Sequence, residues 1–127
     1  VRQAIFDLKV ERVGHGVQVI EDSHLLDEVI ARDITLEVCP GSNFALGINP
    51  DTNSYPIKKL WNLGVNVTVL TDDPPFFHTD MTKEYAASSC AFGWGKKDFK
   101  ALNETSLNAA LCSNNTKDEL IKRLDTE

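Results

Sequence analysis

Three stretches of the chain share one pattern, in which a short apolar run ends at polar, glycine or proline residues and an amphipathic segment follows. The apolar runs lie at residues 11–13, 34–38 and 65–70. The helices expected after them are at about residues 23–32, from Pro56 to Gly64, and at about residues 80–92. Short strands that alternate with helices predict βα units and a parallel sheet.

The remaining segments are predicted to be helical or to connect these units. The chain opens on residues that read as the middle of a helix, and Asp22 is a plausible N-cap for the helix at 23–32. A polar loop is expected between the second strand and Pro56. Residues 96–111 suit one helix, and Thr116 with Glu119 predicts a capping box for the last one.

Strands 34–38 and 65–70 show little polar alternation, which is expected when helices or other strands cover both faces of a sheet. Such a sheet is either open and doubly wound or part of a (β/α)₈ barrel. A barrel needs about 250 residues and eight strands. The 127 residues therefore amount to less than half of a barrel.

Composition narrows the function classes. A net charge of −6 argues against a nucleic acid or an anionic membrane as the main partner. The three cysteines are widely spaced, which favours a reducing, cytoplasmic compartment over a disulfide framework. No apolar run approaches the roughly 18 residues that cross a bilayer.

Chemically reactive residues follow each of the three predicted strands. His15 follows the first, Cys39 with Ser42 and Asn43 the second, and Asp72 with Asp73 the third. In parallel α/β folds the active site lies beyond the carboxyl ends of the strands. The three strand ends together therefore predict an active site.

Each of these residues also has a structural interpretation. His15 is either a general base or a histidine hydrogen-bonded to a backbone carbonyl. The adjacent Asp72 and Asp73 could bind a metal and a hydrogen-bond donor, or they could cap the helix that follows them. Cys39 is interpreted as a small buried residue rather than a nucleophile. The remaining histidines are interpreted as exposed, and both tryptophans as packing residues. Phe76 and Phe77 could form the wall of a site for a planar ligand.

Three motifs carry a resemblance to a known family. They are Arg-Val-Gly-His-Gly at 12–16, Leu-Glu-Val-Cys-Pro-Gly-Ser-Asn at 36–43 and Thr-Asp-Asp-Pro at 71–74. Further matches are Ile-Glu-Asp at 20–22, Pro-Ile at 56–57 and residues 79–85. In order and spacing these motifs resemble the adenosine deaminases, which are zinc-dependent amidohydrolases, over roughly residues 1–111.

The resemblance implies a fold and a reaction. The fold would be the last three βα units and the C-terminal helices of a (β/α)₈ barrel, with residues 1–127 as the C-terminal portion of a single domain. The reaction would convert adenosine or deoxyadenosine and water to the inosine product and ammonia in purine salvage, with Zn²⁺ as cofactor. Asp72 would be a zinc ligand. Asp73 would hydrogen-bond the purine and help to place the hydroxide, and His15 would orient or deprotonate the zinc-bound water.

The family's proton-donating Glu and its zinc-binding histidines have no match among these residues. We therefore expect the isolated chain to be inactive. An open three-stranded sheet would expose two edges and an apolar inner face, and its partner would be the missing N-terminal part of the barrel or a second copy. Two alternatives stay open: a non-catalytic half-barrel that oligomerises, and a parent enzyme that deaminates adenine or a modified purine nucleotide.

Overall fold

A three-stranded parallel sheet lies at the centre of the computed structural model, which describes residues 1–48 and 55–126. The strands are β1 (Arg12–Gly14), β2 (Thr35–Val38) and β3 (Asn66–Val69), and they are hydrogen-bonded in the order β1–β2–β3. Each strand lies within one residue of its predicted bounds. The parallel sheet that the hydrophobic pattern predicts is therefore confirmed.

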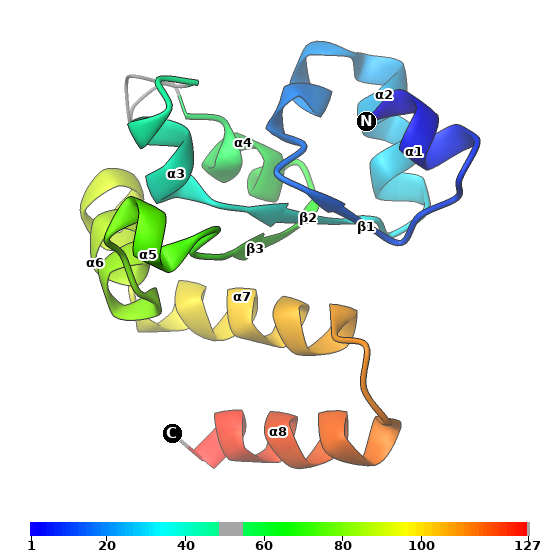
Figure 1. The fold of residues 1–127 in the computed structure, drawn as a ribbon. Coiled ribbons are helices and arrows are strands. Elements are labelled where there is room, and N and C mark those ends of the chain that lie inside the picture. The colour runs from blue at the N-terminus through cyan, green and yellow to red at the C-terminus, as the bar shows by residue number, and fades with distance from the viewer. Residues whose placement is uncertain (49–54, 127) are drawn as a thin grey trace.

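Helices surround this sheet. They are α1 (Arg2–Phe6), the 3₁₀ helix η1 (Val17–Glu21), α2 (Ser23–Ala31), α3 (Pro40–Ala45), α4 (Ile57–Asn62), α5 (Pro74–Phe77), α6 (Met81–Phe92), α7 (Lys96–Ala109) and α8 (Asn114–Thr126). In Figure 1, α1, α2 and α4 lie together on one side of the strands, α7 runs alongside β3, which it contacts, and α8 lies beyond α7. Among the described residues, no helix is both long and apolar enough to cross a membrane.

The two faces of the sheet differ in polarity. Leu36 in β2 lies level with Val13 in β1 and Val67 in β3, so these apolar side chains share one face. The next residue, Glu37, points to the other face and forms an ion pair with Arg12 at 3.2 Å. The sequence analysis predicts that the face of the sheet left open by the missing part of the barrel is apolar. This prediction is wrong, because side chains alternate between the two faces of a strand, and Arg12 and Glu37 lie on the face opposite to Leu36.

The apolar face of the sheet packs into one hydrophobic core with the helices. The buried apolar side chains of the helices include Leu25 and Val29 of α2, Ile57 and Leu60 of α4, and Leu102 of α7. Their spacing of three or four residues places each pair on one side of its helix. Burying each such side chain contributes roughly 1.5–3 kcal/mol. Trp94 is buried and meets Trp61 edge to face, as the packing interpretation predicts.

Caps define where several helices begin. Asp22 accepts a hydrogen bond from the Leu25 backbone N–H at 3.1 Å, which confirms it as the N-cap of α2. The predicted capping box of the last helix is wrong. The Ser113 hydroxyl accepts from the Thr116 N–H at 3.2 Å, so α8 begins at Asn114. At the other end of the connection, α7 ends at Ala109 rather than at residue 111.

The segment after β2 differs most from its prediction. Residues 40–45 form α3, although glycine, serine and asparagine in this stretch are typical of a loop. Pro40 suits the first turn of a helix, where its missing N–H leaves no hydrogen bond unmade. Residues 49–54 of the predicted polar loop lie outside the described residues.

Candidate metal and catalytic site

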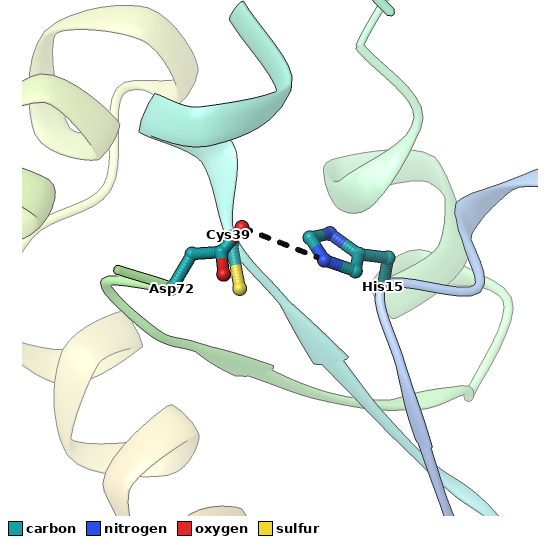
Figure 2. A group of neighbouring side chains, drawn as sticks. All are labelled: His15, Cys39 and Asp72. Carbon is teal, nitrogen blue, oxygen red and sulfur yellow. Dashed lines mark ion pairs between the residues drawn. The ribbon is translucent and has the colours of Figure 1, made fainter. Parts of the chain in front are cut away.

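Three reactive side chains meet beyond the carboxyl ends of the strands, as Figure 2 shows. His15 directly follows β1, Cys39 directly follows β2, and Asp72 is the third residue after β3. Because the strands are parallel, their carboxyl ends lie along the same edge of the sheet. The structure thus brings His15 and Asp72 together, as the strand-end pattern predicts, and adds Cys39 as a third neighbour.

The distances define a small cluster. His15 Nε2 lies 3.6 Å from Asp72 Oδ2, which is an ion-pair distance but too long for a hydrogen bond. The possible ligand atoms of His15, Cys39 and Asp72 all lie within 4.8 Å of one another. The side chains of His15 and Asp72 are 41% and 33% exposed, whereas Cys39 is buried. Solvent and a small ligand can therefore reach the imidazole and the carboxylate.

The backbone is strained at two of these positions. His15 has φ 57° and Asp72 has φ 62°, and both values lie in the left-handed region. This conformation costs an L-residue about 1–2 kcal/mol, although Asp and His tolerate it better than most. The hydrogen bond from the His15 N–H to the Glu37 carbonyl oxygen, at 2.8 Å, holds the strained turn against β2. Strain at both ends of the 3.6 Å pair is typical of a functional site.

The two adjacent aspartates separate in the structure. Asp72 faces His15, whereas Asp73 Oδ1 accepts a hydrogen bond from the Phe76 N–H at 3.2 Å and caps α5. The capping interpretation of the pair therefore holds for Asp73. Phe76 is 70% exposed and packs edge to face on Phe77, so its ring is accessible beside Asp73.

Cys39 is a poor nucleophile in this environment. Burial, and after it the negative charge of Asp72, raises the pKa of the Cys39 thiol to about 11. The thiol is therefore protonated near neutral pH, and the thiolate is the reactive form. This agrees with the interpretation of Cys39 as a small buried residue. A bound cation would favour the thiolate instead, because metal coordination deprotonates thiols.

The donor atoms of the cluster fit a zinc-type metal. Zn²⁺ takes imidazole nitrogen, thiolate sulfur and carboxylate oxygen, which are the donors of His15, Cys39 and Asp72. Bonds of about 2.0–2.3 Å around a tetrahedral ion place ligand atoms roughly 3.3–3.8 Å apart. The atoms of the cluster lie close enough for small side-chain adjustments to reach that geometry. Calcium and magnesium prefer sites made of oxygen alone.

A buried carboxylate beside the cluster escaped the sequence analysis. Glu84 of α6 is 2% exposed, and it accepts hydrogen bonds from the Gly41 N–H at 3.0 Å and the Thr79 hydroxyl at 2.7 Å. It ties α3, which follows Cys39, to the segment that follows Asp73. Its only signal in the sequence is its place in the motif at residues 79–85.

Two polar residues lie behind His15. Asn43 Oδ1 is 3.1 Å from His15 Nδ1, and Asn43 Nδ2 donates to the Tyr55 hydroxyl at 2.8 Å. The sequence indicates Asn43 only as one of several residues at a strand end, and no pattern in it points to Tyr55. Burial raises the pKa of Tyr55 well above its usual value, so its hydroxyl remains neutral.

Other features lie away from the cluster. His24 and His78 are exposed, as predicted, and His24 lies against the ring of Phe6. A cavity of about 500 Å³ opens at the other end of the strands, where Asp33 and Asn66 line it. The strand ends with the reactive side chains, rather than this cavity, are therefore the candidate site.

A parallel α/β sheet with imidazole, thiol and carboxylate groups beyond its carboxyl ends is the arrangement on which metal-assisted α/β enzymes are built. The family model described as adenosine deaminase matches residues 1–127, and the chain belongs to this family. It is 43% identical to an adenine deaminase of Rhizobium rhizogenes and 41% identical to one of Agrobacterium fabrum. Each match covers 98% of the chain, which spans 38% of the length of these relatives.

Solved structures show the same fold. The chain superposes on an adenine deaminase from Arthrobacter aurescens with a TM-score of 0.94 and 25% identity, over 98% of this chain and 38% of the other. A zinc-bound amidohydrolase from Burkholderia ambifaria matches with a TM-score of 0.81 and 24% identity, over 99% of this chain and 38% of the other. These likenesses confirm the predicted fold class, an α/β partial barrel.

Proposed function

We propose that the chain supplies the carboxyl-end half-site of a hydrolytic purine deaminase, as the C-terminal part of one barrel domain, and that the substrate is adenine. The approach of His15 Nε2 to Asp72 Oδ2, at 3.6 Å, carries the proposal. In this proposal Nε2 is the proton acceptor and Asp72 is the metal-binding carboxylate, and both side chains are in reach of solvent. The net reaction adds water to adenine and releases hypoxanthine and ammonia.

Three residues have separate tasks in this reaction. A bound Zn²⁺ would make water acidic enough to act as a nucleophile near neutral pH. Asp72 would hold the ion. His15, although it lies where it could be a ligand, would leave Nε2 free to orient the attacking water and accept its proton. The Asp73 oxygen that does not cap α5 would accept a hydrogen bond from the purine ring, with Phe76 exposed beside it.

Adenine is proposed in place of the adenosine that the sequence motifs predict. The matched relatives that are 37–43% identical over 98% of the chain are named adenine deaminases. Nucleotide deaminases such as the N6-methyl-AMP deaminase of Arabidopsis thaliana match at 24% identity, which supports the shared fold alone. The relatives therefore favour the free base, which was one of the alternatives that the sequence left open.

A chimaera tests the proposal. The matching 38% of the Rhizobium rhizogenes enzyme is replaced by this chain, and ammonia release is measured with adenine, adenosine and AMP. Turnover of adenine, lost in Asp72→Asn and kept in the exposed control Asp27→Asn, is expected. A folded, zinc-loaded chimaera without turnover would overturn the proposal, and a preference for adenosine would overturn its choice of substrate.

A further inference from the structure

The orientation of the His15 ring depends on a buried amide rather than on solvent. Asn43 is 1% exposed, and its Oδ1 lies 3.1 Å from His15 Nδ1. Its backbone is fixed as well, because its N–H donates to the Cys39 carbonyl oxygen within α3 and its own carbonyl accepts from the Ile48 N–H. A buried side chain on a fixed backbone has few rotamers, so its amide presents a defined edge to the imidazole.

Tyr55 in turn holds this amide. The Tyr55 hydroxyl accepts from Asn43 Nδ2 at 2.8 Å, which leaves Asn43 Oδ1 for His15. The Tyr55 ring is 4% exposed and packs against Phe44 at 5.0 Å and Phe92 at 5.9 Å between ring centroids. The hydroxyl is thus positioned by the aromatic core. In the reversed amide, Oδ1 would accept from the Tyr55 hydroxyl and Nδ2 would donate to an unprotonated Nδ1, so the direction of the amide and the tautomer of His15 go together.

The two nitrogens of His15 meet different surroundings. Nδ1 has an acceptor at hydrogen-bond distance, whereas the nearest acidic oxygen to Nε2, on Asp72, is at 3.6 Å. A neutral imidazole carries one proton, and the hydrogen bond that the ring makes decides which nitrogen holds it. With Asn43 Oδ1 as the acceptor, the proton lies on Nδ1. The lone pair of Nε2 is then directed towards the side of the ring where Asp72 lies.

We infer that Asn43 and Tyr55 are positioning residues that hold neutral His15 in the Nδ1–H tautomer, so that Nε2 is free to accept a proton beside Asp72. This inference deepens the proposed function, on which the role of Nε2 rests. The Nε2–H tautomer could not accept a proton at that position, so the tautomer decides whether His15 can serve as a base. Partners of this kind typically change activity by roughly 10–100-fold when they are removed.

The test reads the tautomer directly in the 127-residue chain, without metal or substrate. Long-range ¹H–¹⁵N spectra, recorded at a pH where the imidazole is neutral, distinguish a protonated ring nitrogen from one with a lone pair. For His15 we expect a protonated Nδ1 and an unprotonated Nε2. The exposed His24 and His78 serve as internal references and should show the mixture of an unconstrained ring.

Three variants separate positioning from folding. Asn43→Leu removes the acceptor and should return His15 to the mixture of His24, whereas Asn43→Asp keeps an acceptor and should keep the Nδ1–H tautomer. Tyr55→Phe removes only a hydroxyl and keeps the ring between Phe44 and Phe92. It should release the amide and give a mixed signal, even if Asn43→Leu fails to fold.

Two results would overturn the inference. One is a protonated Nε2 in the unaltered chain, which would mean that Tyr55 donates and the amide is reversed. The other is an unchanged His15 spectrum in a folded Asn43→Leu or Tyr55→Phe chain. Neither result depends on turnover, so an inactive chimaera would count against the proposed function and leave the tautomer assignment standing. In an active chimaera, Asn43→Leu should lower kcat by roughly 10–100-fold.

Discussion

At the scale of single residues, the candidate site combines a strained backbone at His15 and Asp72 with a thiol, Cys39, whose raised pKa keeps it unreactive near neutral pH. His15 and Asp72 both have left-handed φ values, and their side chains approach from different strands to 3.6 Å. Cys39, between them in the sheet order, is kept protonated by burial. The same three side chains would change character with a cation, because a positive charge favours the thiolate and the carboxylate.

The thiols should differ sharply in their reaction with an alkylating reagent. Cys90 and Cys112 are exposed, whereas burial raises the pKa of Cys39 to about 11. The thiolate fraction of Cys39 is small at neutral pH and grows as the pH rises towards about 11, so its reaction should be slow and should accelerate in that direction. Peptide mapping by mass spectrometry measures the three rates. Equal rates near neutral pH would contradict the prediction.

A side chain at Gly41 should lower the stability of the chain. A Cβ at this position would lie 2.2 Å from Glu84 Oε1, so Gly41→Ala must displace the buried carboxylate from its two donors. We expect a loss of about 1–3 kcal/mol in the free energy of unfolding, measured with urea. Gly14→Ala is the matched control, because its Cβ would meet nothing within 4 Å. Equal stability of the two variants would rule out the steric argument.

At the scale of elements, the loops beyond β2 and β3 are joined by side chains rather than by the sheet. Glu84 of α6 connects the first turn of α3 to the segment before α6 through Gly41 and Thr79. Cys39 lies just before α3, and Asp72 lies before α5, which separates it from Thr79. We therefore expect the spacing of the possible metal ligands to depend on this buried carboxylate, which lies outside the cluster.

Glu84→Gln should loosen this link. A carboxylate accepts at both oxygens, whereas an amide has only one oxygen and would set its NH₂ group against one of the two donors. We expect a loss of about 1–3 kcal/mol in the free energy of unfolding and weaker binding of Co²⁺ to the cluster, followed by its visible spectrum. Glu119→Gln, on the exposed side of α8, is the control and should change neither quantity. Unchanged cobalt binding in Glu84→Gln would show that the link does not position the cluster.

At the scale of the whole molecule, the described sheet has two edges. β1 and β3 each have β2 as their one hydrogen-bonded neighbour, and the face away from the hydrophobic core carries the Arg12–Glu37 pair. The chain spans 38% of the length of its matched relatives, so further barrel strands are available in them to cover these edges. Because the second face is polar, we expect self-association through the edges rather than through an apolar surface.

The purified chain should therefore form a concentration-dependent dimer through its strand edges. Sedimentation velocity over a range of concentrations measures the association. A monomer at every concentration would contradict edge pairing, and large irregular aggregates would point instead to apolar contacts.

The purified chain is also predicted to release no ammonia from adenine or adenosine, even with added Zn²⁺. The cluster offers three donors, but no carboxylic acid matches the family's proton donor within this sequence. Coupled ammonia assays test this prediction, and the chimaera is the positive control. Turnover by the purified chain would show that its own residues suffice.

The local pattern of the sequence was enough to predict the parallel sheet, the main helices and the strand ends that carry His15, Cys39 and Asp72. These features follow from the spacing of apolar residues, from helix-capping residues and from turn residues. Each of these signals depends only on residues that are close together in the sequence. Helix α3 could not be predicted in this way, because Gly41, Ser42 and Asn43 favour a loop, and contacts of this segment with distant residues such as Glu84 and Tyr55 add to its local hydrogen bonds.

The chemistry of the site required the tertiary structure. The sequence determined which groups stand at the strand ends, because that order is set along the chain. Only the fold decided that Asp72 faces His15 while Asp73 caps α5, and that Asn43 and Tyr55 lie behind the imidazole. The contacts of His15 with Asp72 and Asn43, and of Asn43 with Tyr55, join residues 12–57 positions apart, and no local pattern encodes a distance or a hydrogen-bond partner across such a separation.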